Sequence, residues 1–192
     1  DGREESPSIH LNPQSGRWLP DNTYLQRHVN AAIAYSVWQY YQATGDREFL
    51  GAFGAEIILE IARFFASITE YNATRERFEI RGVVGPDEYH TSYPGKGKPG
   101  IDNNAYTNIM ACWVLCRACE VLSLLDSYRR EELCSNLLIS FEECARWEQM
   151  SQRMFIPFME NGIICQFEGY EKLRELDWGR FRNVYGENMG LD

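Results

Sequence analysis

The stretch of sequence from residue 104 to residue 125 reads NAYTNIMACWVLCRACEVLSLL. Its large apolar side chains, among them Met110, Trp113, Val114 and Val121, are distributed around much of a helical circumference and do not form a single stripe. A helix of this kind buries more than one side. We therefore predict a helix from about Asn104 to Leu125 in the inner layer of a mainly α-helical fold.

The residues that precede this stretch predict two further helices. Apolar residues recur at helical spacing from Thr23 to Thr44, and the pattern stops at Gly45. Asp46 is suited to cap the next helix, in which apolar residues recur as far as Ile68. The short connection between the two helices predicts an antiparallel pair.

The remaining segments carry shorter or weaker patterns. Partial alternation after Arg75 predicts a short strand or one arm of a hairpin. The other expectations are a long loop over residues 1–22, short helices near 128–138 and 140–154, a possible strand over 162–167, and an aromatic, polar tail to residue 192.

The bulk composition excludes several classes of partner. The chain has 192 residues and a formal net charge of −9, and it contains no basic run suited to a phosphate backbone, so no nucleic acid is expected. No apolar run predicts a membrane span or signal peptide, so no membrane partner is expected. The six cysteines are not spaced like a secretory disulfide framework, which favours a cytoplasmic location.

No cofactor or metal is expected from the sequence. Cys112, Cys116 and Cys119 match a three-cysteine spacing of iron–sulfur enzymes, but the same spacing forms one stripe on a helix, and core packing is the simpler interpretation. The three histidines lack zinc-ligand spacing. The glycine motifs of dinucleotide-binding proteins and serine hydrolases are also missing from the sequence.

One loop concentrates groups that can transfer protons. The segment GPDEYH, residues 85–90, places a turn signal, two carboxylates and an imidazole ahead of the predicted inner helix. Loops held by a rigid scaffold often carry catalytic groups. From spacing alone, the alternative is a plain turn in which Asp87 caps the local backbone and Glu88 is solvated.

A second polar cluster, DNNAYTN at residues 102–108, begins the inner helix. Asn103 or Asn104 can serve as the helix cap, which explains one amide but not the whole cluster. Sugars are recognised by short polar groups together with flat aromatic rings. The two clusters supply both kinds of group, since Tyr89, Tyr93 and Tyr106 accompany the asparagines.

Together the two clusters resemble the catalytic-acid region of glycoside hydrolase family 65, which includes maltose, kojibiose, nigerose and trehalose phosphorylases. Four further segments resemble the same family in the same order: DGREE at 1–5, the helix that begins at Gln26-Arg27-His28, TGD at 44–46 and QFEGY at 166–170. The resemblance implies that residues 1–192 are a fragment of a single (α/α)6-barrel catalytic domain, a helical toroid with short β elements in the catalytic loop region. The flanking parts of that barrel would lie outside the chain.

The resemblance also implies a mechanism and a set of site residues. Glu88 would be the general acid that protonates the glycosidic oxygen, while inorganic phosphate, as co-substrate, attacks the anomeric carbon and inverts it to β-glucose 1-phosphate. The substrate would be an α-linked glucoside or disaccharide. The expected substrate-binding residues are Asp87, His90, Asn103, Asn104, Arg27, His28 and Trp18, the last in the loop that borders the leaving-group site.

Two alternatives to a phosphorylase stay open at this point. One is a hydrolase of the same family, which would need a second carboxylate to activate water. The other is an inactive helical module, because about five helices cannot close a ring of twelve and would expose apolar faces. For the same reason we expect the isolated chain to form oligomers or to require companion segments.

Overall fold

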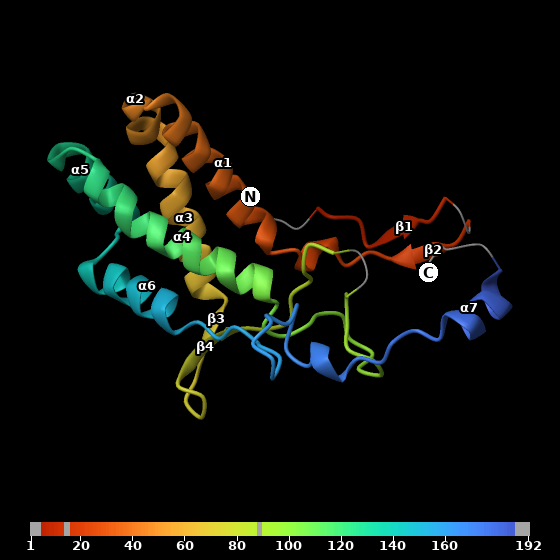
Figure 1. Ribbon diagram of the computed structural model, residues 1–192. Helices are drawn as coiled ribbons and strands as arrows, with labels where there is room; N and C mark the ends of the chain where they lie inside the picture. Colours follow the sequence, from red (N-terminus) through yellow and green to blue (C-terminus); the bar gives the residue numbers. More distant parts are fainter. Residues whose placement is uncertain (1–4, 14–15, 88–89, 187–192) are drawn as a thin grey trace.

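The computed structural model describes residues 5–13, 16–87 and 90–186 (Figure 1). The expected mainly helical fold is confirmed. The helices of the described residues are α1 (His28–Thr44), α2 (Arg47–Phe49), α3 (Ala55–Ser67), α4 (Ala105–Leu124), α5 (Ser127–Leu137), α6 (Phe141–Arg153) and α7 (Trp178–Tyr185). The strands are β1 (Ile9–Leu11), β2 (Trp18–Pro20), β3 (Thr69–Asn72) and β4 (Arg77–Ile80).

The predicted antiparallel pair is present as α1 and α3, but α1 begins at His28 and not at Thr23, since Thr23–Leu25 forms a separate 3-10 turn. Gly45 ends α1 with φ at 67°, a left-handed conformation that glycine adopts without steric cost, and its N–H donates to the Tyr41 carbonyl. The Asp46 side chain then accepts a hydrogen bond of 2.8 Å from the Phe49 amide and caps α2. A π-helical turn, Leu50–Gly54, continues into α3, which runs back antiparallel to α1 (Figure 1).

α4 is the central helix, as its sequence predicts. It packs against α1, α3 and α6, and its fully buried side chains include Ala111, Val114 and Leu115 (Figure 1). By length and composition alone, α4 is apolar enough to cross a membrane. The core helix of a globular fold meets the same criterion, and the contacts of α4 with three other helices are those of a core helix.

α5 and α6 also lie where short helices were predicted. Asp126 caps α5 and Ser140 caps α6, each through its side-chain oxygen. Trp147 and Met150 bury the inner face of α6 against α4. A charged pair ties α6 to α3, since the Arg63 Nε lies 2.9 Å from the Glu143 Oε1.

A β-hairpin extends the helical core beneath α3 and α6. β3 and β4 are antiparallel, with Thr69 opposite Ile80 and Asn72 opposite Arg77, and Phe78 forms an isolated bridge with Met154. The predicted strand after Arg75 is therefore one arm of a hairpin. Its other arm, β3, lies where the sequence pattern shows only the fading end of a helix.

Three segments differ from the sequence prediction. The long loop over residues 1–22 contains the hairpin of β1 and β2, whose three-residue strands are too short and too exposed to produce an alternating pattern. The predicted strand over 162–167 is wrong, because a turn at Gly162 limits pairing to the single bridge between Phe158 and Ile164. The polar tail contains α7, which the Asp177 side chain caps.

The cysteine stripe follows the packing interpretation in part. Cys112 and Cys119 are partly buried and pack against the core, whereas Cys116 is exposed. Burial raises the pKa of the Cys112 thiol to about 12, so this thiol stays protonated at neutral pH. All six cysteines are free thiols.

Candidate functional site

The loop that carries the GPDEYH motif begins on buried, paired backbone. Val83 and Ile101 exchange two backbone hydrogen bonds of 3.0 and 2.8 Å. The Val84 amide donates to the Leu25 carbonyl at 3.0 Å, and both valines are only 2% exposed. Residues 83 and 84, which lead into the motif, are therefore hydrogen-bonded to the segment before α1 and to the segment before α4.

Gly85 fits against the start of α4 at a position where no side chain has room. A Cβ atom on Gly85 would lie 2.4 Å from the Asn104 Nδ2. Asn104 is the cap of α4, and its Oδ1 accepts hydrogen bonds of 2.9 Å from both the amide and the hydroxyl of Thr107. Its Nδ2 donates to the Gln166 carbonyl at 3.2 Å, so one asparagine holds three segments together.

Asp87 and His90 form a tight pair on either side of residues 88 and 89. The Asp87 Oδ2 lies 2.7 Å from the His90 Nδ1, and its Oδ1 accepts from the His90 amide at 2.9 Å. The His90 ring also contacts the rings of Phe167 and Tyr170, with centroid distances of 5.1 and 5.9 Å. Glu88, the predicted acid, lies outside the described residues.

Asn103 is fully buried and has an unusual backbone conformation. Its φ is 51°, in the left-handed region that asparagine tolerates better than most residues. The Asn103 Nδ2 donates to the Glu168 Oε2 at 2.7 Å, and its Oδ1 accepts from the Asn108 Nδ2 at 3.2 Å. The amides of Asn103 and Asn104 are therefore bonded within the chain.

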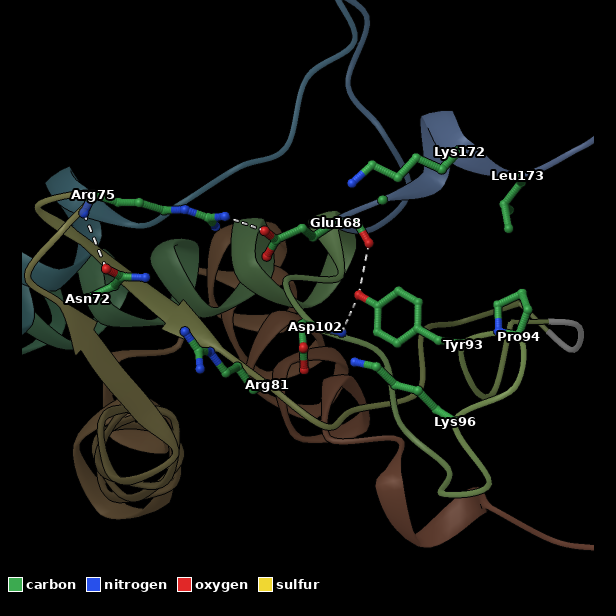
Figure 2. A pocket seen from close by; sticks show the side chains of 11 residues that line it. Asn72, Arg75, Arg81, Tyr93, Pro94, Lys96, Asp102, Glu168, Lys172 and Leu173 are labelled. Atoms are coloured by element: carbon green, nitrogen blue, oxygen red, sulfur yellow. Dashed lines mark hydrogen bonds and ion pairs between the residues drawn. The ribbon is translucent and has the colours of Figure 1, made fainter.

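A charged network extends from Asn103 to the β3–β4 hairpin. Figure 2 shows its Arg75–Glu168 pair. Arg75 forms an ion pair with Glu168 and a second one with Glu79, where the Arg75 Nη1 lies 3.1 Å from the Glu79 Oε1. Glu79 is 1% exposed, and Arg81 supplies a further hydrogen bond of 2.9 Å to it. The Arg75 hydrogen bond, followed by the one from Asn103, lowers the pKa of Glu168 despite its partial burial.

His28 and Arg27 lie at the start of α1, which faces the start of α4. The His28 ring meets the Tyr106 ring edge-on at a centroid distance of 5.7 Å. Burial lowers the pKa of His28, and a backbone interaction at Val84 partly opposes this shift. The buried Nδ1 of His28 has no hydrogen-bond partner among the described residues.

Trp18 is placed apart from these groups. It lies on β2, in a hairpin that projects away from the helices, and 65% of its surface is exposed (Figure 1). The structure therefore gathers Asp87, His90, Asn104 and His28 around the ends of α1 and α4. Trp18 is not brought together with them.

Sequence reasoning missed the side chains that support the site. Glu79 and its arginines lie in an alternating charged and apolar run, RERFEIR at 75–81, which indicates a strand but not a buried ion pair. Glu168 belongs to the segment QFEGY at 166–170, but its contact with Asn103 depends on tertiary structure and could not be read from that segment. No group of three or more metal-ligating side chains is arranged for metal binding in the described part of the chain.

The arrangement suits recognition of a neutral, hydroxyl-rich ligand. An imidazole–carboxylate pair, a second imidazole and the rings of Tyr106 and Tyr170 surround the described edges of the motif loop. Buried backbone pairing and the Asn104 cap fix the positions of these groups. Such pre-positioning lowers the entropic cost of binding a ligand in one orientation.

Curated relatives match this chain along its length. An uncharacterised glycosyl hydrolase of Mycobacterium tuberculosis (strain ATCC 25618 / H37Rv) is 50% identical over 192 residues, all of this chain but 14% of the relative. Trehalose 6-phosphate phosphorylase of Lactococcus lactis is 36% identical over 191 residues, 100% of this chain and 23% of the relative. Kojibiose phosphorylase of Halothermothrix orenii is 36% identical over 169 residues, 86% of this chain and 21% of the relative. The chain thus spans less than a quarter of the length of these three relatives.

A solved structure supports the fold. A protein assigned as a kojibiose phosphorylase, from the human microbiome, superposes with a TM-score of 0.69 at 21% identity, over 82% of this chain and 22% of that one. The family model of the glycosyl hydrolase family 65 central catalytic domain matches residues 1–191. This match covers nearly the whole chain and includes both polar clusters around the start of α4. The chain therefore belongs to glycoside hydrolase family 65.

Proposed function

We propose that this chain is a segment of the (α/α)6-barrel catalytic domain of a longer enzyme, an inverting α-glucoside phosphorylase. The enzyme would cleave an α-linked disaccharide or glucoside with inorganic phosphate and release β-glucose 1-phosphate. Family membership and the kojibiose, trehalose 6-phosphate and glucosylglycerol phosphorylases among the relatives support this proposal.

The observation that carries the proposal is the way the motif loop is held before residue 88 and after residue 89. Gly85 is seated on the Asn104 cap, and Asp87 is bonded to His90, which packs against Phe167 and Tyr170. A general acid must reach the leaving oxygen within hydrogen-bond distance, so its backbone has to be held in place. These contacts support the backbone before residue 88 and after residue 89.

In this proposal Glu88 donates its proton to the glycosidic oxygen as the bond to the anomeric carbon breaks. Phosphate attacks that carbon from the opposite face, so no second carboxylate is needed to activate water. Glu88 must be protonated beforehand, which burial or a neighbouring negative charge favours. Asp87 is one residue away and is the nearest such charge in sequence.

The other predicted site residues have distinct proposed roles. Asp87, His90, Arg27 and His28 contact the sugar hydroxyls, and Trp18 contributes to the leaving-group side from its hairpin. For Asn103 and Asn104 we propose a positioning role, because their amides are bonded to Glu168, Asn108, Gln166 and Thr107.

The test uses the full protein that carries this chain, together with its Glu88→Gln variant. Kojibiose, trehalose 6-phosphate, maltose and glucosylglycerol are each incubated with and without phosphate, and β-glucose 1-phosphate and glucose are quantified. We expect phosphate-dependent β-glucose 1-phosphate from at least one substrate. Loss of a general acid costs about 10²–10⁴-fold in rate, and the variant should show a loss of this size.

Glu131→Gln is the matched control, since Glu131 lies on the exposed face of α5 and the substitution removes the same charge. This variant should keep wild-type activity. Glucose release that does not require phosphate would instead identify a hydrolase. Full activity in Glu88→Gln would show that another group is the acid. If the full protein is folded but inactive on all four substrates, the proposed phosphorolysis of these substrates is wrong.

A further inference from the structure

A cavity of about 510 Å³ opens beside the paired side chains of Arg75 and Glu168 (Figure 2). Segments from the β3–β4 hairpin, from the turn around Tyr93 and from the segment after Phe167 form its walls. The Tyr93 hydroxyl joins two of these walls, since it donates to the Glu168 carbonyl at 2.8 Å and accepts from the Asp102 amide at 3.1 Å. The volume is in the range of small-molecule pockets.

Cationic side chains converge on this cavity. Arg75, Arg81, Lys96 and Lys172 line it, together with the carboxylates of Asp102 and Glu168. The chain has a net charge of −9 and only three lysines, yet two of them are here. This local excess of cations is unlike the rest of the chain and favours an anionic ligand.

The carboxylates at the cavity are already engaged. Glu168 is paired with Arg75, and the Asp102 Oδ1 accepts from the Gly82 amide at 3.1 Å. The arginines are also anchored, because both form ion pairs with the buried Glu79. These pairs hold Arg75 and Arg81 at the cavity wall without a ligand.

The two lysines are the cations that remain available. Among the described residues, the Lys172 ammonium has no ion pair, and the Lys96 Nζ lies over the Tyr93 ring at 4.4 Å from its centroid. Both lysines are exposed. Figure 2 shows them reaching from opposite walls, Lys96 from the turn after Tyr93 and Lys172 from the segment after Glu168. An ammonium on each side suits a small dianion.

We propose that this cavity binds the phosphoryl group of a small ligand, with Lys96 and Lys172 as its direct ligands and Arg81 as a supporting charge. A phosphoryl group carries about 1.5–2 negative charges at neutral pH and has strong acceptor oxygens, which match two ammonium groups. The cavity has room for an attached monosaccharide. The ligand class is therefore a sugar phosphate, and free inorganic phosphate shares the same recognising chemistry.

This site is separate from the proposed catalytic site, because none of the described residues of the motif loop lines the cavity. Binding is measured by calorimetry on the full protein that carries this chain, with glucose 6-phosphate, glucose 1-phosphate, inorganic phosphate and glucose as separate probes. Phosphate, glucose 1-phosphate and glucose are also ligands of the proposed catalytic site, so binding at this cavity is the part of the heat that the lysine substitutions described below remove. We expect this part for the sugar phosphates and none for glucose. If inorganic phosphate binds with similar affinity, recognition rests on the phosphoryl group alone. If the sugar phosphates bind more tightly than inorganic phosphate, the sugar also contributes to binding.

Two variants complete the test. Lys96→Ala combined with Lys172→Ala should weaken sugar phosphate binding about ten-fold or more, since charge-assisted hydrogen bonds are lost. Lys98→Ala is the control, because Lys98 is on the same turn but does not line the cavity.

Two results would overturn the proposal. One is that no phosphorylated probe gives a measurable heat of binding at millimolar concentration. The other is an equal loss of affinity in Lys98→Ala and in the double variant, which would indicate general charge attraction. Circular dichroism of each variant checks that the fold is retained, as expected for substitutions at exposed positions.

Discussion

Gly85 leaves no room for a side chain at the point where the motif loop meets the start of α4. A Cβ would lie 2.4 Å from the amide nitrogen of Asn104, the residue that caps this helix. We predict that Gly85→Ala lowers the free energy of unfolding by about 1–3 kcal/mol, because the cap must move to relieve the overlap. Urea denaturation measures the loss.

The matched control for this substitution is Gly51→Ala. A Cβ on Gly51 would lie 3.9 Å from the Leu125 side chain, an ordinary contact, and the residue is within a helical turn. Alanine should therefore stabilise the protein by about 0.5–1 kcal/mol at this position. Equal stability of the two variants would show that the Asn104 cap tolerates the displacement.

At the scale of elements, Glu168 links the β3–β4 hairpin to the start of α4. It is paired with Arg75 and bonded to Asn103, and these contacts hold its pKa below the ordinary value of 4.5. A carboxyl with a lowered pKa in the folded state stabilises that state above its unfolded pKa. This contribution is lost as the pH falls below about 4.5 and through the lowered value.

We therefore predict that Glu168→Gln lowers the free energy of unfolding at pH 7. The difference in this free energy between variant and wild type should shrink as the pH falls from about 5 to about 3, a range that includes the ordinary pKa of 4.5. Unfolding free energies from urea titrations at several pH values give this difference directly. Glu160→Gln, at an exposed position, provides the comparison. A difference that stays constant with pH would mean that the Glu168 charge does not contribute.

The elements predicted from sequence are those with a strong local signal. α1, α3 and α4 have long apolar patterns and recognisable ends, such as Gly45 and the Asn104 cap, so their positions agree with the sequence. β1 and β2 pair through backbone bonds between exposed residues, which leave no pattern in side-chain polarity.

For the site, the sequence located the two polar clusters but not the contacts between them. Asp87 and His90 are close in sequence, and their pairing follows from a local turn. The contact of Asn103 with Glu168 spans 65 residues, and local patterns carry no information about it. The supporting Arg75–Glu79 pair was missed for a different reason, because burial of a charge depends on the packing of α6 and the following loop.

The whole molecule exposes apolar side chains at the ends of its central helices. Val29 and Ile33 on α1 are each 47% exposed, and Tyr106 and Ile109 on α4 are 43% and 42% exposed. The His28–Tyr106 contact brings these two helix ends together. Exposed apolar patches of this kind favour association.

We predict that residues 1–192 expressed alone self-associate, and that Val29→Ser with Ile33→Ser reduces the association. Size-exclusion chromatography with light scattering gives the mass. Tyr128→Ser removes an apolar residue that is 77% exposed on α5, and it should have little effect. A wild-type chain that is monomeric at micromolar concentration would contradict this prediction.

The link between the start of α4 and Gln166 bears on how the chain is made. The Ala105 amide donates to the Gln166 carbonyl at 2.8 Å, and Asn104 donates to the same oxygen across 62 residues of sequence. Ribosomes deliver the chain from its N-terminus, so α1, α3 and α4 emerge before Gln166 does. A nascent chain that ends before Gln166 already contains most of the helical core. The start of α4 then lacks its bonds to Gln166 and is accessible to chaperones and proteases.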